Sequence, residues 1–239
     1  MPRWKNMPAS WSPRRGWGSA TARWIGCSSG TASPTKKTRV ASERNEELRQ
    51  QFLNDLAPYL RTPARLVFLD ESGFNTAMTR GYGRAHRTRR VRCAVPRNWG
   101  RNQTLICAVQ ATGPFAPLVV EGAVNGPIFE WYVQEVLCPA LTPGQVVVLD
   151  NLSAHHRASV RTRIEAQGCS VLFLPPYSPD FNPIEMLFSK VKALVRAGEW
   201  RNVSALLQSI WAALDAVTLR DVFGWFTHAF PNIFLCQML

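Results

Sequence analysis

Two short apolar runs, each ending on an aspartate, constrain the fold more than any other feature of the sequence. Residues 66–69 read LVFL and are followed by Asp70, and residues 146–149 read VVVL and are followed by Asp150. A continuous apolar run of this length is typical of a strand that is buried on both faces of a sheet. Both runs are therefore predicted to be central strands, each with an acid at its end.

The remaining patterns predict the other elements of a mixed α/β fold. Further strands are expected at QTLICAVQATG, APLVVEGAVNG and SVLFLP, and the first three strands in chain order are predicted to form an antiparallel meander. Helices are expected from Pro127, from an N-cap at Ser153 to Gly168, and over residues 183–197, about 203–216 and 219–229. This order predicts one sheet of three antiparallel and two further strands, flanked by helices.

Asp70 and Asp150 are expected to lie side by side. In an open α/β sheet the crevice at the strand ends is the usual ligand site, and neighbouring strands are ~4.8 Å apart. Two carboxylates at such a distance repel each other unless a cation lies between them. Carboxylate oxygens suit Mg²⁺ or Mn²⁺, and two such ions can hold the attacking and leaving oxygens of a phosphodiester. The pattern therefore predicts a two-metal site for phosphodiester chemistry.

A proline-rich segment, LPPYSPDFNPIE at residues 174–185, delivers a third acid. Its prolines prevent the segment from forming a helix or pairing as a strand. Asn182 is expected to cap the next helix and Pro183 to be its first residue. Glu185 then lies in the first turn of that helix, aimed rigidly at the crevice. Lys192 is on the same side of the helix, where it could meet phosphate.

Each of these acids also has a simpler interpretation. Glu185 could complete a capping box with Asn182, and Asp70 and Asp150 could be ordinary turn residues at strand ends. Glu71 competes with Asp70 for the metal, but strand alternation points the two to opposite faces, so only one can face the ions. Alternation by itself does not decide which of the two this is.

Positive charge is both abundant and concentrated. The chain has 28 Lys and Arg against 16 Asp and Glu, a net charge of +12. No acid lies between Glu71 and Glu121, where the sequence has Arg80, Arg84, Arg87, Arg89, Arg90, Arg92, Arg97 and Arg101. A solvated face is the simpler interpretation, but a run this dense without counter-charges favours contact with the DNA backbone.

Nothing in the sequence predicts secretion or a membrane span. The six cysteines are scattered without a CxxC pair, and no apolar signal segment or run of ~18 apolar residues occurs. We expect a reduced, cytoplasmic protein, associated with the nucleoid if its source is prokaryotic.

Three blocks, FLDESG, LDNLSAHH and LPPYSPDFNPIEMLFSKVK, occur in order, and 34 residues separate Asp150 from Glu185. With these blocks, residues 36–229 resemble the DDE transposases of the insertion-sequence 630 branch of the Tc1/mariner superfamily. The resemblance implies a ribonuclease-H-like fold and a catalytic triad of Asp70, Asp150 and Glu185 that binds two Mg²⁺ or Mn²⁺ ions. It also implies DNA cleavage at the element's terminal inverted repeats and strand transfer into a TA target by a homodimer.

Supporting roles are implied for three more polar residues. By resemblance, His155 supports a metal ligand or contacts phosphate, and Asn151 and Asn182 orient a carboxylate or a water molecule. The alternative is that all three are ordinary turn, cap or surface residues.

The N-terminal segment departs from the family pattern, because no helix-turn-helix is found in residues 1–40. We expect residues 1–35 to be an atypical, poorly ordered segment, residues 36–64 a linker helix capped by Ser42, residues 65–229 the catalytic domain and residues 230–239 a tail. Two alternatives to an active transposase stay open. One is an inactive relic that only binds DNA, and the other is a different ribonuclease-H-like nuclease, which would not be expected to have the proline-rich segment or the 34-residue interval.

Overall fold

The computed structural model of the chain describes residues 41–86, 90–152, 155 and 157–231, all within the compact unit of residues 40–239. The predicted N-terminal segment, the predicted cap at Ser153, two arginines of the basic run and almost all of the predicted tail lie outside the described residues.

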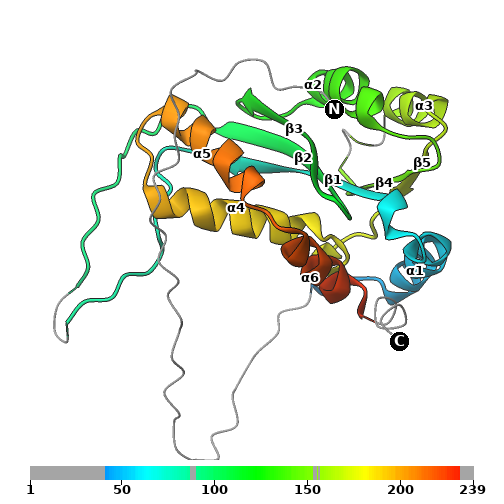
Figure 1. Ribbon diagram of the computed structural model, residues 1–239, viewed down its shortest axis with the longest axis horizontal. Coiled ribbons are helices and arrows are strands. Elements are labelled where there is room, and N and C mark those ends of the chain that lie inside the picture. Colours follow the sequence, from blue (N-terminus) through cyan, green and yellow to red (C-terminus); the bar gives the residue numbers. More distant parts are fainter. Residues whose placement is uncertain (1–40, 87–89, 153–154, 156, 232–239) are drawn as a thin grey trace, which may run out of the picture. The chain divides into compact units, whose positions relative to one another are not determined.

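One five-stranded sheet, in the order β3-β2-β1-β4-β5, lies at the centre (Figure 1). Its strands are β1 (Leu66–Phe74), β2 (Gln103–Gln110), β3 (Gly113–Glu121), β4 (Val146–Leu149) and β5 (Ser170–Phe173). The β1-β2 and β2-β3 pairs are antiparallel, and the β1-β4 and β4-β5 pairs are parallel. The predicted mixed sheet, with the two apolar runs as neighbouring inner strands, is confirmed.

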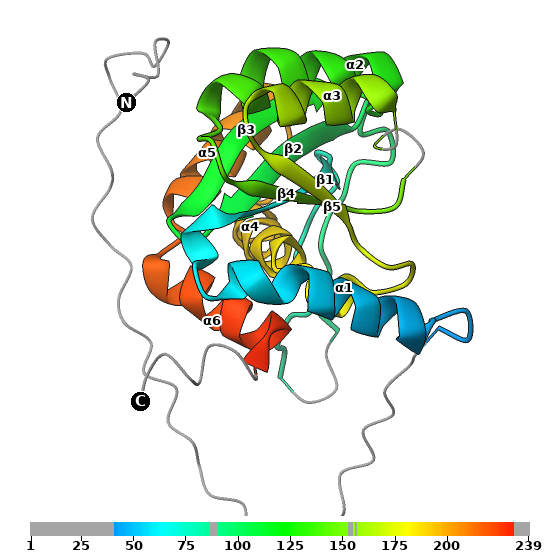
Figure 2. The ribbon, with the colours of Figure 1, turned by 90° about the vertical axis from the view of Figure 1, so that its right-hand side faces the viewer.

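Helices cover both faces of the sheet. They are α1 (Glu46–Leu60), α2 (Gly126–Tyr132), α3 (Ala158–Ala166), α4 (Ile184–Gly198), α5 (Val203–Asp215) and α6 (Leu219–Ala229). A π-helical turn, Val133–Leu137, and a 3-10 turn, Cys138–Ala140, continue α2. Figure 2 shows α2 and α3 on one face and α1, α4 and α6 on the other. In the described part of the chain, no helix is long and apolar enough to cross a membrane.

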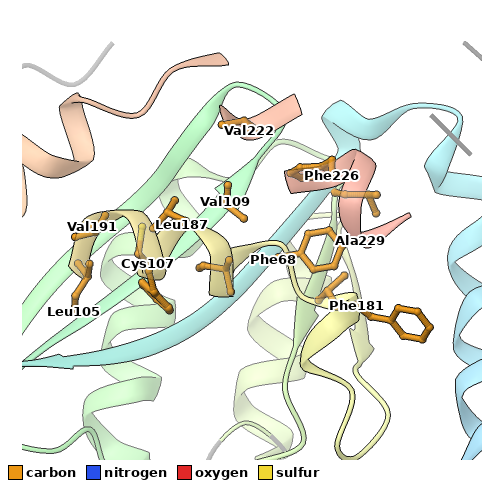
Figure 3. Packing of buried hydrophobic residues seen from close by; sticks show 14 of the residues in the cluster. Phe68, Leu105, Cys107, Val109, Phe181, Leu187, Val191, Val222, Phe226 and Ala229 are labelled. Carbon is orange, nitrogen blue, oxygen red and sulfur yellow. The ribbon is translucent and has the colours of Figure 1, made fainter. Parts of the chain in front are cut away.

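Two apolar cores follow from the alternation of side chains along the strands. Val67 and Leu69 point to the α2-α3 face, and Phe68 points to the opposite face. On that opposite face, side chains of α4 and α6 such as Leu187 and Phe226 close over the sheet (Figure 3). The sheet is therefore buried on both sides, which explains why its inner strands are continuously apolar.

Two predicted helix starts are wrong. The N-cap of α1 is Asn45, whose side chain accepts hydrogen bonds from two backbone N–H groups at 2.9 and 3.1 Å. Ser42 lies before this cap, in a turn closed by a bond from the Arg44 N–H to the Ala41 carbonyl. Helix α3 begins only at Ala158, because Arg157 before it has an extended backbone.

The predicted linker helix is part of the main core. Phe52, Leu56 and Leu60 of α1 are buried in the same cluster as the inner face of α4. A sequence pattern can show that a helix is amphipathic, but only the packing shows which surface it covers.

Candidate active site

The parallel pairing of β1 and β4 brings the two predicted aspartates to one place. Leu69 and Leu149 are partners in this pairing, so Asp70 and Asp150 are the next residues along neighbouring chain segments. Phe68 and Val148, two residues earlier in each segment, face α4. Alternation therefore directs Asp70 toward α4, and Asp150 follows the strand end on the same side.

Glu185 approaches from α4. It is the second residue of that helix and lines, together with Asp70 and Asp150, one cavity of about 430 Å³. The cavity is completed by residues 174–179 of the proline-rich segment and by Asn151, Leu152 and Asn182. The structure thus brings all three predicted acids together.

Asp70 is held by two hydrogen bonds and has a perturbed pKa. Its Oδ1 accepts a hydrogen bond from the Glu71 N–H at 2.8 Å, and its Oδ2 accepts one from Asn182 Nδ2 at 3.2 Å. Burial, reinforced by the negative charges of Asp150, Glu71 and Glu185, raises the pKa of Asp70 to about 7 although the Glu71 N–H acts in the opposite direction. A nearby cation would relieve both the desolvation and the repulsion.

Asn182 has a different role from the predicted cap. The residue before Ile184 is Pro183, and no side chain caps α4, so both the predicted cap and the alternative capping box with Glu185 are wrong. Instead, the buried Asn182 side chain turns to Asp70, while its Oδ1 has no hydrogen-bond partner among the described residues. Its backbone carbonyl accepts from the Glu185 N–H at 3.2 Å, which links the position of Glu185 to that of Asn182.

The proline-rich segment is anchored to α1 by an arginine. Arg49, only 4% exposed, donates two hydrogen bonds to Asp180 at 2.9 and 2.6 Å, and its guanidinium lies 3.8 Å from the centre of the Phe181 ring. Although burial acts in the opposite direction, the guanidinium lowers the pKa of the Asp180 carboxyl. This anchor fixes the chain immediately before Asn182 and Glu185.

His155 is buried between two acids. Its Nε2 lies 3.0 Å from Glu71 Oε1 and its Nδ1 lies 2.5 Å from Asp150 Oδ1. The Nδ1 contact is an ion pair and lacks the alignment of a good hydrogen bond. The ring also packs on Phe129, with a centroid distance of 4.2 Å. Burial alone would lower the pKa of His155, but the two carboxylates outweigh it and raise the pKa to about 9. At neutral pH His155 is therefore an imidazolium that holds Asp150.

Glu71 forms a contact with His155 that the sequence pattern did not predict. As expected from alternation, it points away from Asp70, but it does not face solvent: its side chain is 13% exposed and pairs with His155. The signal was present in the sequence, because alternation puts Glu71 on the same face as Val67 and Leu69, where an acid requires a polar partner.

The donor set fits a hard divalent cation. Three carboxylates line the cavity, and burial together with the negative charges of Asp150 and Glu185 raises the pKa of Asp70. In the described part of the chain, no three acidic, histidine or cysteine side chains have already converged into a complete metal site.

Lys192 and Asn151 lie at the margin of the site. The Lys192 Nζ is 5.8 Å from the centre of the Phe74 ring, and Lys192 does not line the cavity. Burial, helped by the charge of Arg196, lowers the pKa of Lys192, while Glu185 and Asp70 act in the opposite direction. Asn151 lines the cavity and is exposed.

The basic run leaves the sheet between β1 and β2 as a long connection, visible in Figure 1. Of its arginines, Arg87 and Arg89 lie outside the described residues, and Arg101 forms an ion pair with Glu121 at 3.0 Å. The others are exposed, namely Arg80, Arg84, Arg90, Arg92 and Arg97. Arg201 holds the base of the connection by donating to the Thr76 carbonyl at 3.0 Å.

Comparisons with known proteins agree with this geometry. Residues 65–207 match the family described as DDE superfamily endonuclease. A comparison by sequence with curated proteins finds no match.

Among solved structures, the chain is similar to a pre-cleavage Mos1 transpososome, with a TM-score of 0.69 and 17% identity over 87% of this chain and 67% of that chain. It is similar to the mariner Mos1 paired-end complex with Mg, with a TM-score of 0.66 and 17% identity over 86% and 67% of the two chains. The Mos1 catalytic domain matches with a TM-score of 0.56 and 16% identity over 80% of this chain and 93% of that chain. The chain thus spans about two thirds of the longer Mos1 chains, and the likeness confirms the predicted ribonuclease-H-like fold.

Proposed function

The chain belongs to the DDE superfamily endonucleases, and from this premise we propose that it is a transposase catalytic domain that cuts DNA at transposon ends and joins them to target DNA. One observation carries the proposal. Asp70, Asp150 and Glu185 come from β1, from the end of β4 and from α4, and all three line the same cavity.

Asp70, Asp150 and Glu185 would hold two divalent ions, Mg²⁺ or Mn²⁺. When bound, such ions lower the pKa of an attacking water or 3′-hydroxyl and neutralise charge on the scissile phosphate. The Mos1 paired-end complex, a protein of the same fold, contains Mg in one structure and Mn in another, which supports this choice of metals.

The surrounding residues would set the direction of each carboxylate. Asn182 donates to Asp70, and the imidazolium of His155 holds Asp150 from the opposite side of the sheet. Glu71 keeps His155 in place through Nε2. Because both ring nitrogens of His155 face carboxylates and the ring is buried, we assign His155 to positioning Asp150, not to phosphate contact.

DNA binding would rest on the basic connection between β1 and β2. Its exposed arginines and the net charge of +12 suit a polyanion. We propose terminal inverted repeats and a TA target as the DNA, a homodimer on paired ends as the working form, and the cytoplasm, in association with the nucleoid, as the location. Sequence resemblance supports these assignments.

A strand-transfer assay tests the proposal. Duplexes with precut ends and a free 3′-hydroxyl are incubated with a plasmid target and Mg²⁺, and we expect joined products that disappear in Asp150→Asn and without the metal. Glu130→Gln is a matched control, since Glu130 lies on α2, bonds to Ser159 and Arg157, and does not line the cavity.

Two other outcomes would contradict the proposal. Salt-sensitive DNA binding without joining or cutting would indicate an inactive relic. Metal-dependent cutting without any joining would indicate a nuclease of the same fold with a different task.

A further inference from the structure

The cavity that holds the three acids has a second wall of different chemistry. It is lined by Leu152, Pro175, Pro176, Tyr177 and Pro179 alongside the carboxylates, and no lysine or arginine of the described residues lines it. This wall has no positive charge to pair with a phosphate, and its apolar and aromatic surfaces suit an uncharged, flat part of a substrate.

Tyr177 is the unusual member of this wall. Its side chain is 59% exposed, and its backbone φ of 54° is in the left-handed region, which bulky residues rarely occupy. Its ring and hydroxyl make no hydrogen bond, ion pair or ring contact with the residues that the structure describes.

Among the residues that the structure describes, Ala116 and Glu199 are the other non-glycine residues with positive φ, and they differ from Tyr177 in this respect. The Ala116 carbonyl accepts from the Tyr132 hydroxyl at 2.7 Å, and the Glu199 carboxylate accepts from the Thr79 hydroxyl at 2.6 Å. Each therefore has a local contact that accompanies its strained backbone. Tyr177 has the strain without such a contact, and strain of this kind is often retained at functional sites.

The backbone around Tyr177 is held firmly. Pro176 and Pro179 restrict the chain on either side, and the buried Ser178 donates a hydrogen bond from its Oγ to the Pro176 carbonyl at 3.2 Å. The bidentate pair of Arg49 and Asp180 anchors the next turn. The ring is thus presented from a fixed backbone, and only its two χ angles remain to be ordered on contact with a ligand.

From these observations we propose that Tyr177 is a stacking platform for the nucleobase next to the scissile phosphate. This inference rests on the proposed function, because it takes the acids of the same cavity as the site of the phosphate. In a DNA strand a nucleoside lies next to each phosphate. With the scissile phosphate at the acids, the neighbouring nucleoside would therefore lie at the apolar wall. An aromatic ring accepts any base, since every base has a π-face. The platform would therefore act without sequence preference, and Leu152 would add apolar contact to the same base.

Base stacking can be measured directly with a fluorescent base. A short duplex with a single-stranded overhang carries 2-aminopurine at one position at a time around the junction, and binding is followed without divalent ions, so that no cutting occurs. We expect the wild type and Tyr177→Phe to quench the fluorescence at one position. We expect Tyr177→Ala to lose the quenching and to bind about 5- to 150-fold more weakly.

Two variants separate stacking from other causes. Tyr177→Gly removes the ring and also suits a φ of 54°, so it should be at least as thermally stable as the wild type while it loses the quenching. Trp131→Ala removes an aromatic ring that is 53% exposed on α2 and does not line the cavity, and it should keep the quenching.

Quenching that is equal in the wild type, Tyr177→Ala and Tyr177→Gly would overturn the inference, as would a wild type that never quenches. The joining assay is scored separately. If the wild type joins DNA but quenching is independent of Tyr177, only the stacking platform fails. If quenching depends on Tyr177 but no cutting or joining occurs, the proposed transposase activity fails and the nucleobase site stands.

Discussion

Replacing Glu71 by glutamine should weaken metal binding in a cavity that Glu71 does not line. Glu71 Oε1 is 3.0 Å from His155 Nε2, and the other ring nitrogen is 2.5 Å from Asp150 Oδ1. In the wild type the imidazolium is shared between two carboxylates. Glutamine keeps the size and one hydrogen bond but removes a charge, so the imidazolium is left to Asp150 alone and competes more strongly with a metal ion for that carboxylate.

The size of the effect follows from the type of bond that changes. The bond to glutamine still has the charged imidazolium as donor, so it should lie at the lower end of the about 1.5–3 kcal/mol that a hydrogen bond to a charged group contributes, and the free energy of unfolding should fall by roughly 1 kcal/mol. Outer partners of metal ligands typically change metal affinity by about 10- to 100-fold. We therefore expect Mn²⁺ to bind Glu71→Gln about tenfold more weakly than the wild type, and the pKa of His155 to fall.

Mn²⁺ binding to the protein without DNA can be measured by the electron paramagnetic resonance signal of the free ion, and joining activity is then compared at saturating metal. Glu130→Gln is the control for a general loss of stability in the α2-α3 layer, because Glu130 accepts a hydrogen bond from Ser159 and forms an ion pair with Arg157 in that layer. The reasoning is refuted if Glu71→Gln binds Mn²⁺ as tightly as the wild type, or if Glu130→Gln weakens the binding equally.

Asp70→Asn should stabilise the metal-free protein above pH 7. Because the pKa of Asp70 is raised from 3.8 to about 7, the folded state holds a proton that the unfolded state has already lost, and wild-type stability falls as the pH rises through this window. The free energy of unfolding of the variant should not fall in this window, so above pH 7 it should exceed that of the wild type by up to roughly 4 kcal/mol in urea denaturation. A difference that is independent of pH would contradict this reasoning. Arg49→Ala should cost roughly 3 kcal/mol in the same assay, the lower end for a buried pair because the Asp180 side chain is 48% exposed; unchanged stability would show that the proline-rich segment does not depend on this anchor. The double substitution Arg84→Ala and Arg90→Ala should weaken DNA binding equally for all sequences and reduce the slope of log affinity against log salt by about 2; an unchanged slope would mean that these arginines do not contact phosphate.

The elements of the fold could be predicted because their signals are local. The apolar runs before Asp70 and Asp150 identify the inner strands, and the apolar periodicity of residues 184–198 identifies α4. Burial on both faces of a sheet leaves a continuous apolar run, and burial on one face of a helix leaves a period of 3.6, so each pattern is readable without knowing the partner.

Helix starts were harder to predict because several side chains compete to cap the same backbone groups. Asn45 and Ser42 are both good cap residues, and Asn182 is a good cap that instead donates to Asp70. Which residue caps a helix depends on the local backbone geometry and on the tertiary contacts of each candidate side chain. A sequence pattern does not contain these tertiary contacts.

The sequence by itself determined the strand and helix order, the three acids and the interval between the last two, because these depend on neighbours along the chain. The tertiary structure alone decided that Glu71 holds a buried His155, that His155 holds Asp150, that Arg49 anchors the proline-rich segment, and that Tyr177 lines the cavity of the acids. These contacts are between residues that are far apart in the sequence. They form only when strand register and helix packing bring the residues within contact distance.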